Sequence, residues 1–280
     1  MRRIAIINQK GGVGKTTTAV NLGAALARLG QRVCILDLDP QAHATTHLGL
    51  EPDGELPSMY DVLLGQKSLA EVRRHADDLL SIVGSDINLA AAEVELAGVV
   101  GREVILREQL ALDSQEFDFM LLDCAPSLGV LTLNALAAAN EVFIPLQPHF
   151  LALHGLGKLL ETTALVARRI NPGLRVSGVV ICLYDAATRL AQEIVRDLIA
   201  FLEKSKSANV PWRDAQVFET RIRRNIKLAE CPSFGQSVYR YAPTCNGATD
   251  YLQLAREVLG VPIAPDAPIA ETPAPELASV

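Results

Sequence analysis

The 280-residue chain lacks the features of several common protein classes. Its formal net charge is −6, so it has no generally basic surface, and contact with nucleic acid requires a local cluster of cations. Its five cysteines form no CxxC pair, and no histidine lies at zinc-ligand spacing from any of them, which argues against a zinc site. No stretch is apolar for about 18 residues and no signal-peptide region precedes the first apolar run. We therefore expect a cytoplasmic protein without a transmembrane helix.

What the chain does contain is enough apolar sequence for a large core, since 49% of its residues are hydrophobic. Cys34, Cys124 and Cys182 lie within or beside apolar runs, which indicates small core residues in a reducing compartment. Strand-like apolar runs alternate with helical stretches, as in a parallel sheet covered on both faces. These runs are residues 4–7, 33–36, 80–83, 119–122, 142–146 and 176–182, with a weaker one at 216–218. We predict an α/β fold with one doubly wound, mostly parallel sheet flanked by helices.

The chain shows no internal repeat and no charged linker before residue 260, so we expect a single domain over residues 1–260. Within it, residues 51–66 are rich in Gly, Pro and Asp and read as a surface excursion. Residues 89–112 read as one helix with a solvated charged face, and residues 250–259 as a terminal helix. Residues 261–280 are rich in proline and contain no Lys or Arg. This composition predicts a disordered tail rather than a basic amphipathic membrane anchor.

A glycine-rich stretch joins the first apolar run to a helical one and has the form of a phosphate loop with an additional lysine at its front. It consists of Lys10, Gly11, Gly12, Val13, Gly14, Lys15, Thr16 and Thr17. Glycines let the backbone approach a polyphosphate, so that N–H groups and the N-terminus of the following helix point at the anion. Lys15 is placed to bind the β- and γ-phosphates, and the Thr16 hydroxyl to bind Mg²⁺.

Carboxylates follow two of the predicted strands. Asp37 and Asp39 come directly after the second strand, and Asp123 ends the fourth. The carboxyl ends of strands in such a sheet face the ligand crevice, and alternation places Asp37 and Asp39 on the same side. A nucleotide hydrolase needs carboxylates to position water and to hold Mg²⁺ through water, and these three are the candidates.

With these residues in view, the chain resembles the ParA/Soj chromosome-partitioning branch of the ParA/MinD family, the deviant phosphate-loop ATPases. The matching segments are residues 10–17, 37–41, 123–129, 144–147 and 225–235. The resemblance extends over nearly all of residues 1–260 and implies binding of ATP and Mg²⁺. It implies that Asp39 orients the attacking water, and that Asp37 and Asp123 support Mg²⁺ through water. It also implies an ATP-bound homodimer in which Lys10 crosses to the partner's phosphates, as an arginine finger acts in trans.

A local cluster of cations is the candidate nucleic-acid surface. Arg221, Arg223, Arg224 and Lys227 place four cations within seven residues. The resemblance implies that the ATP dimer binds nonspecific double-stranded DNA through this segment, with Arg189 as a further contact. The chain departs from the family at Arg223, where the family often has proline, and at Ala187, where the family commonly has arginine.

The resemblance further implies slow ATP hydrolysis to ADP and phosphate, stimulated by a ParB/Spo0J-like partner, and a cytoplasmic, nucleoid-associated protein. Three alternatives stay open at this point. One is a MinD-like membrane-cycling ATPase, which the proline-rich end argues against. Another is ParA-like positioning of a cargo other than DNA. The third is an iron–sulfur or redox carrier, for which no second well-placed cysteine beside Cys124 is evident.

Overall fold

The computed structural model describes residues 1–149 and 152–261. The predicted tail, residues 261–280, lies outside this part of the chain except for residue 261. The strands are β1 (Arg2–Ile6), β2 (Val33–Leu38), β3 (Arg74–Asp77), β4 (Leu80–Val83), β5 (Phe119–Cys124), β6 (Glu141–Leu146), β7 (Arg175–Tyr184) and β8 (Gln216–Arg223). They form one sheet in the order β3-β4-β2-β5-β1-β6-β7-β8, in which only β3 and β4 pair antiparallel among the described strands. The predicted α/β fold with a mostly parallel sheet is confirmed.

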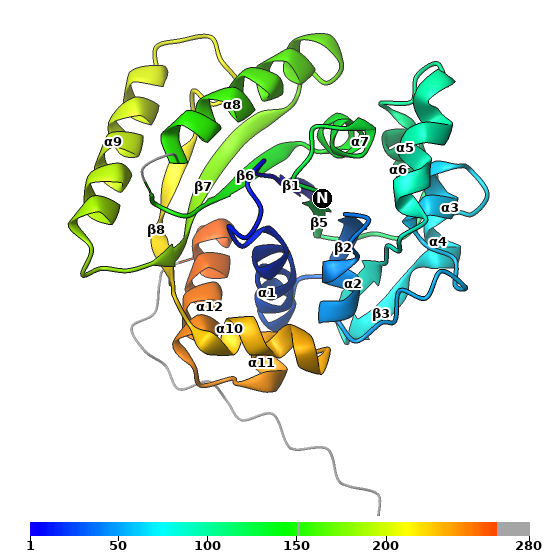
Figure 1. The fold of residues 1–280 in the computed structure, drawn as a ribbon, viewed down its shortest axis with the longest axis horizontal. Coiled ribbons are helices and arrows are strands. Elements are labelled where there is room, and N and C mark those ends of the chain that lie inside the picture. Colours follow the sequence, from blue (N-terminus) through cyan, green and yellow to red (C-terminus); the bar gives the residue numbers. More distant parts are fainter. Residues whose placement is uncertain (150–151, 262–280) are drawn as a thin grey trace, which may run out of the picture.

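Helices cover both faces of this sheet (Figure 1). They are α1 (Lys15–Arg28), α2 (His43–His47), α3 (Met59–Leu63), α4 (Leu69–Val72), α5 (Leu89–Glu95), α6 (Ile105–Leu112), α7 (Val130–Ala138), α8 (Ala152–Arg169), α9 (Arg189–Ser205), α10 (Ile226–Glu230), α11 (Val238–Tyr241) and α12 (Asn246–Leu259). Two 3₁₀ turns, η1 (Leu96–Gly98) and η2 (Cys231–Phe234), complete the set. Among the helices of the described residues, none has the length and apolar run that a membrane span requires.

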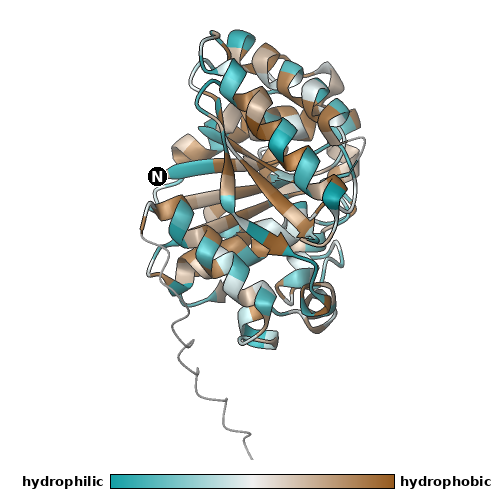
Figure 2. Cartoon of the chain, turned by 90° about the vertical axis from the view of Figure 1, so that its left-hand side faces the viewer, coloured by the Kyte–Doolittle hydropathy of each residue, from teal (hydrophilic) through white to brown (hydrophobic). Residues whose placement is uncertain are grey.

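The core consists of two apolar layers, one on each face of the sheet, because successive strand residues point to opposite sides. In β1, Ile4 and Ile6 join the layer beneath α1 and α12, whereas Ala5 joins the layer beneath α7 and α8. Figure 2 shows the same arrangement as apolar strands enclosed by helices with polar outer faces. This alternation places Asp37 and Asp123 on the α1 side, since their strand neighbours Ile35 and Leu121 belong to that layer.

The structure corrects three expectations. Residues 89–112 are not one helix, because the chain leaves η1 and turns at Gly101 (φ 78°) before α6 begins. Residues 51–66 are not wholly a surface excursion, since α3 lies within them and buries Met59 completely. The weak strand predicted at 216–218 is longer and extends to Arg223, so β8 contains Arg221 and Arg223.

Strand β8 is an edge strand whose backbone is covered by carboxylates from α12. Glu257 accepts hydrogen bonds from the backbone N–H groups of Glu219 (2.6 Å) and Thr220 (3.1 Å). Asp250 accepts one from the backbone N–H of Arg223 (2.9 Å). Helix α12 therefore satisfies donors that an open sheet edge leaves unpaired, and it packs against both β8 and α1.

Gly178 in β7 provides a test of this packing. A Cβ at this position would lie 2.2 Å from the ring of Phe218, which packs edge-on against Phe143. We expect Gly178→Ala to lower the free energy of unfolding by about 1–3 kcal/mol, because the ring cannot move without displacing its neighbour. Urea denaturation measures the loss. Gly173→Ala is the control, since its Cβ would meet its nearest neighbour at 3.7 Å, and equal stability of the two variants would contradict the account.

Candidate active site

The glycine-rich loop lies between β1 and α1, at the carboxyl edge of the sheet. Gly12 (φ 72°) and Gly14 (φ 95°) adopt left-handed conformations that a side chain disfavours. Gly14 precedes α1 directly, so the first N–H groups of that helix, which have no intrahelical partner, face the cavity beside the loop. Gly11, Gly12, Gly14, Lys15, Thr16 and Thr17 line this cavity. The side chain of Val13 is buried instead, so Val13 contributes only backbone.

The two lysines of the loop have different environments. Lys15 is almost fully buried, and its Nζ donates to the backbone oxygen of Lys10 (3.2 Å). Burial lowers the pKa of Lys15, and the charges of Asp123 and Asp39 act in the opposite direction. Lys10 is exposed at the rim, where its Nζ lies 2.6 Å from Nε2 of His149. Lys15 is thus directed at the anion site of its own chain, and Lys10 is held outside that site.

Asp37 and Asp123 stand opposite each other in the β2–β5 register, and both are fully buried. Asp37 accepts hydrogen bonds from Thr45 through the backbone N–H (2.9 Å) and the hydroxyl (2.7 Å). Burial raises the pKa of Asp37 to about 6, although these hydrogen bonds oppose the rise. Burial also raises the pKa of Asp123, and the charge of Asp37 raises it further. No described residue gives either oxygen of Asp123 a well-formed hydrogen bond, although Thr16 lies close enough to lower its pKa.

Asp39 occupies the turn after β2 and lines the cavity, together with Gln41 and His43. Its Oδ1 accepts a hydrogen bond from the backbone N–H of Gln41 (3.0 Å). Ala42 in the same turn has φ 52°, and Leu183 on the far side of the cavity also has φ 52°. These are the two non-glycine residues with positive φ in the described part of the chain; Leu183 lines the cavity, and Ala42 lies between two residues that line it, Gln41 and His43. Such strained backbone is typical of functional sites.

The cavity has a volume of about 400 Å³, which suits a small-molecule ligand. Its residues fit a nucleoside triphosphate with Mg²⁺. Backbone N–H groups and Lys15 supply the anion site, and Asp123, whose oxygens receive no well-formed hydrogen bond from the described residues, supplies a buried acceptor next to the cavity. Among the described residues, no three His, Cys, Asp or Glu side chains are arranged to hold a metal by themselves. Mg²⁺ in proteins keeps several waters and binds through one or two carboxylates plus phosphates.

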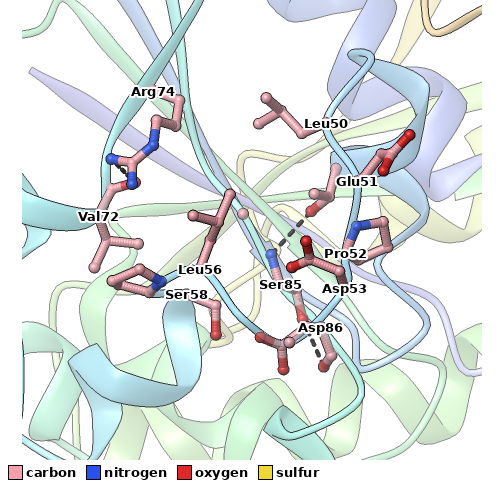
Figure 3. Close-up of a pocket in the computed structure, with 14 residues that line it drawn as sticks. Leu50, Glu51, Pro52, Asp53, Leu56, Ser58, Val72, Arg74, Ser85 and Asp86 are labelled. Carbon is pink, nitrogen blue, oxygen red and sulfur yellow. Dashed lines mark hydrogen bonds between the residues drawn. The ribbon is translucent and has the colours of Figure 1, made fainter.

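A smaller cavity of about 70 Å³ lies behind Thr45, between the loop after α2 and the end of β4. In Figure 3, Asp53 on that loop lies near Ser85 and Asp86, whereas the side chains of Glu51 and Arg74 lie apart from them on either side. The backbone N–H of Ser85 donates to the hydroxyl of Thr45 (2.9 Å), which itself donates to Asp37. Thr45 therefore connects the carboxylate of β2 to the end of β4.

The predicted DNA-binding cations do not share one environment. Arg189 and Arg224 are exposed, and no described residue pairs with either guanidinium. Lys227 pairs with Glu230 (2.8 Å), and Arg221 is half-buried. Arg223 pairs with Asp250 (2.6 Å) and also lines the large cavity. Arg189 and Arg224 follow the paired ends of β7 and β8, so both lie at the carboxyl edge of the sheet.

Sequence reasoning did not find three residues that shape this site: Thr45, His149 and Asp250. Each contacts a predicted site residue, namely Asp37, Lys10 and Arg223 respectively. The signal for Thr45 was weakly available, because it lies only eight residues after Asp37. His149 is 139 residues from Lys10, and nothing in the local sequence connects the two.

Comparisons with known proteins agree with this geometry. The family model described as AAA domain matches residues 1–176. Sporulation initiation inhibitor protein Soj from Bacillus subtilis is 41% identical over 256 residues, covering 91% of this chain and 97% of that protein. Chromosome-partitioning ATPase Soj from Thermus thermophilus is 45% identical over 260 residues, covering 92% and 96%. A crystal structure described as cobyrinic acid a,c-diamide synthase from Mycobacterium smegmatis, with bound ATP analogue and magnesium, has a TM-score of 0.77 at 36% identity, covering 92% and 94%.

Replacement of Asp123 by Asn tests the metal-supporting role. We expect the ligand-free variant to melt at the same or a higher temperature than the wild type, because a buried carboxylate that lacks well-formed hydrogen bonds is costly. We also expect loss of the Mg²⁺-dependent rise in Tm that ATP produces, since that rise reports ligand binding to the folded state. Thermal melting with and without ATP, Mg²⁺ and EDTA measures both.

Asp118→Asn is the matched control, because Asp118 lies just before β5 and pairs with Arg32 at the opposite edge of the sheet. This variant should keep the full Mg²⁺-dependent rise in Tm. A full rise in Asp123→Asn as well would show that Asp123 does not support the metal.

Proposed function

The chain belongs to the ParA/Soj family of chromosome-partitioning ATPases, and we propose that its ATP-bound form is a dimer that binds nonspecific double-stranded DNA. A DNA-bound, ParB/Spo0J-like partner then stimulates ATP hydrolysis and releases the dimer as monomers. The observation that carries the proposal is the phosphate-loop cavity, which brings Lys15, Thr16 and Asp39 together beside the buried carboxylates of β2 and β5. The relative of 45% identity that is named as a chromosome-partitioning ATPase supports this function over the synthase activity named for a structure of 36% identity.

Within one subunit, the proposed roles follow from position. Lys15, buried at the anion site, neutralises charge on the transferred phosphoryl group, and the backbone N–H groups that precede it orient the phosphates. Thr16 supplies the hydroxyl for Mg²⁺, and Asp37 and Asp123 hold its waters. Asp39 lines the cavity and orients the attacking water. Magnesium and ATP supply the Lewis acid and the scissile phosphoanhydride bond when they are bound.

Lys10 is proposed to act on the partner subunit's nucleotide. Lys15 already occupies the cationic position in its own site, and Lys10 neither lines that cavity nor points its ammonium there. It lies instead at an exposed rim, beside His149. A second subunit facing this rim would receive Lys10 as a cation supplied in trans, which stabilises charge in the transition state. The shared nucleotide then becomes part of the dimer interface, so hydrolysis favours dissociation.

The proposed DNA surface is the carboxyl edge beyond β7 and β8. Among the described residues, no carboxylate pairs with Arg189 or Arg224 of this surface, and Lys227 and Arg221 lie close to them in the chain. A dimer presents this surface twice, which doubles the number of phosphate contacts and makes affinity strongly dependent on ATP and salt. The protein is accordingly proposed to be cytoplasmic and nucleoid-associated, with residues 1–260 as the ATPase domain and residues 261–280 as an acidic tail.

Mixing of two inactive variants tests the action of Lys10 in trans. We expect Lys10→Ala to bind ATP normally and to lose about 10²-fold or more in hydrolysis, because only a transition-state contact is removed. Asp39→Ala should also be inactive. In a mixed dimer, the Lys10→Ala subunit keeps its Asp39 and receives Lys10 from the other subunit, so mixing should restore phosphate release.

Lys206→Ala, an exposed lysine paired with Glu203 on a remote helix end, is the control and should retain wild-type hydrolysis. Failure of the mixture to regain activity, although the variants form dimers, would place Lys10 in its own site or outside catalysis.

Arg224→Ala tests the DNA surface. In the presence of ATP and Mg²⁺, we expect weaker binding to unrelated duplexes and a salt dependence reduced by about two counterions per dimer, one for each lost contact. ATP affinity should not change. Fluorescence anisotropy at several salt concentrations provides the measurement.

Arg168→Ala is the matched control, because Arg168 is exposed at the end of α8, on the opposite edge of the sheet. Wild-type DNA affinity that is the same with and without ATP would refute the proposed switch. An Arg224→Ala variant indistinguishable from Arg168→Ala would refute the proposed surface.

A further inference from the structure

The large cavity continues beyond the phosphate loop to the carboxyl ends of β7 and β8. Its far wall is mainly apolar, formed by Leu183, Ile222, Leu228 and Ala229. Since the phosphates belong at the loop and the cavity has one continuous volume, the base of a bound nucleotide belongs against this apolar wall. The polar side chains there are Arg223 and Asn225. Asn225 uses its Oδ1 to accept from the backbone of Lys227 at the start of α10.

Arg223 is held in one orientation by Asp250. Its Nη2 donates to Oδ1 of Asp250 (2.6 Å), and its Nε lies 3.1 Å from both oxygens of the same carboxylate. The backbone N–H of Arg223 donates to Asp250 as well (2.9 Å). The Asp250 side chain is only 4% exposed, whereas that of Arg223 is 49% exposed. A carboxylate that binds the edge of a guanidinium fixes its plane and leaves stacking to its flat faces.

Helix α12 ties this pair to the phosphate end of the cavity. Tyr251, the residue after Asp250, lines the cavity, and its hydroxyl lies 3.1 Å from Oγ1 of Thr18 in the first turns of α1. Both Asp250 and Tyr251 are buried. Arg223 is therefore placed at a defined position relative to the phosphate loop, through two neighbouring residues of one helix.

The same pairing makes Arg223 a poor contact for DNA phosphate. Nonspecific DNA affinity comes from net positive charge that releases counterions. The charge of Arg223 is offset by that of Asp250, whereas the next residue, Arg224, has no carboxylate partner among residues 1–149 and 152–261. Two adjacent arginines thus suit different ligands, one a flat ring and the other a phosphate.

We propose that Arg223, oriented by Asp250, is a nucleotide-contacting residue that stacks on the purine base of ATP and favours purine over pyrimidine nucleotides. This inference rests on ATP binding in the proposed function, and it reassigns Arg223 from the DNA surface to the nucleotide site. A guanidinium stacked on an aromatic ring contributes most to affinity when the ring is large and desolvated, which favours a purine.

Calorimetric titration of the full-length wild type, Arg223→Ala, Arg223→Lys and Arg224→Ala tests the assignment, with ADP, CDP and inorganic tripolyphosphate as ligands in Mg²⁺ buffer. We expect Arg223→Ala to weaken ADP binding about tenfold and to leave tripolyphosphate binding unchanged, because only the base contact is lost. The preference of the wild type for ADP over CDP should shrink in the variant. Arg224→Ala should bind all three ligands as the wild type does.

Arg223→Lys guards against a folding artefact, because it keeps the charge beside buried Asp250 but lacks the planar group. We expect it to melt close to the wild type and still to lose most of the preference for ADP over CDP. Equal losses for ADP and tripolyphosphate in this variant would overturn the proposal. So would unchanged ADP binding combined with weaker DNA binding, which would return Arg223 to the DNA surface. A wild type that binds none of the three ligands would instead refute the ATPase function itself.

Discussion

The structure depends on the burial of two carboxylates side by side. Asp37 and Asp123 face each other across β2 and β5 with no exposure to solvent. Such a pair is costly unless neighbouring groups donate hydrogen bonds or supply positive charge. Thr45 donates twice to Asp37, and Lys15 on α1 provides the nearby cation. Strand register, the turn after β2 and the phosphate loop are therefore parts of one electrostatic unit. It is completed by a divalent cation and the phosphates it accompanies.

This unit is in contact with the segment that contains Lys227, at the carboxyl edge of the sheet. Helix α2, which follows the turn containing Asp39, packs against η2 through His47, whose Nε2 lies 3.3 Å from Sγ of Cys231. Gly49 and Gly235 meet at backbone distance, since a Cβ on Gly235 would lie 2.7 Å from Cα of Gly49. Because η2 directly follows α10, the turn near the nucleotide and the segment with Lys227 are packed as neighbours. Such contiguous contacts are the physical condition for coupling between the nucleotide site and the proposed DNA surface.

Much of the fold was predictable because its signals are local. Apolar runs such as residues 33–36 and 119–122 are as long as a buried strand, and each ends in an aspartate at the ligand edge. The prediction of one helix over residues 89–112 was wrong, because the helical periodicity of the sequence gives no sign of a turn made by a single glycine, Gly101. The antiparallel strand β3 was missed because its four residues, Arg74–Asp77, are mostly polar and gain their order from pairing with β4.

By itself, the sequence determined the phosphate loop, its following helix and the acidic strand ends. Glycine conformation and two-residue alternation act over a few bonds and need no distant partner. Tertiary structure decided which of the charged side chains form ion pairs within the chain and which can bind a ligand. Arg223 and Arg224 are adjacent in sequence, yet only Arg223 meets Asp250, 27 residues away, because α12 lies along the edge of β8. Lys10 likewise meets His149 only because β6 pairs beside β1. Ion pairing depends on distance in space, and that distance exists only once the sheet has formed.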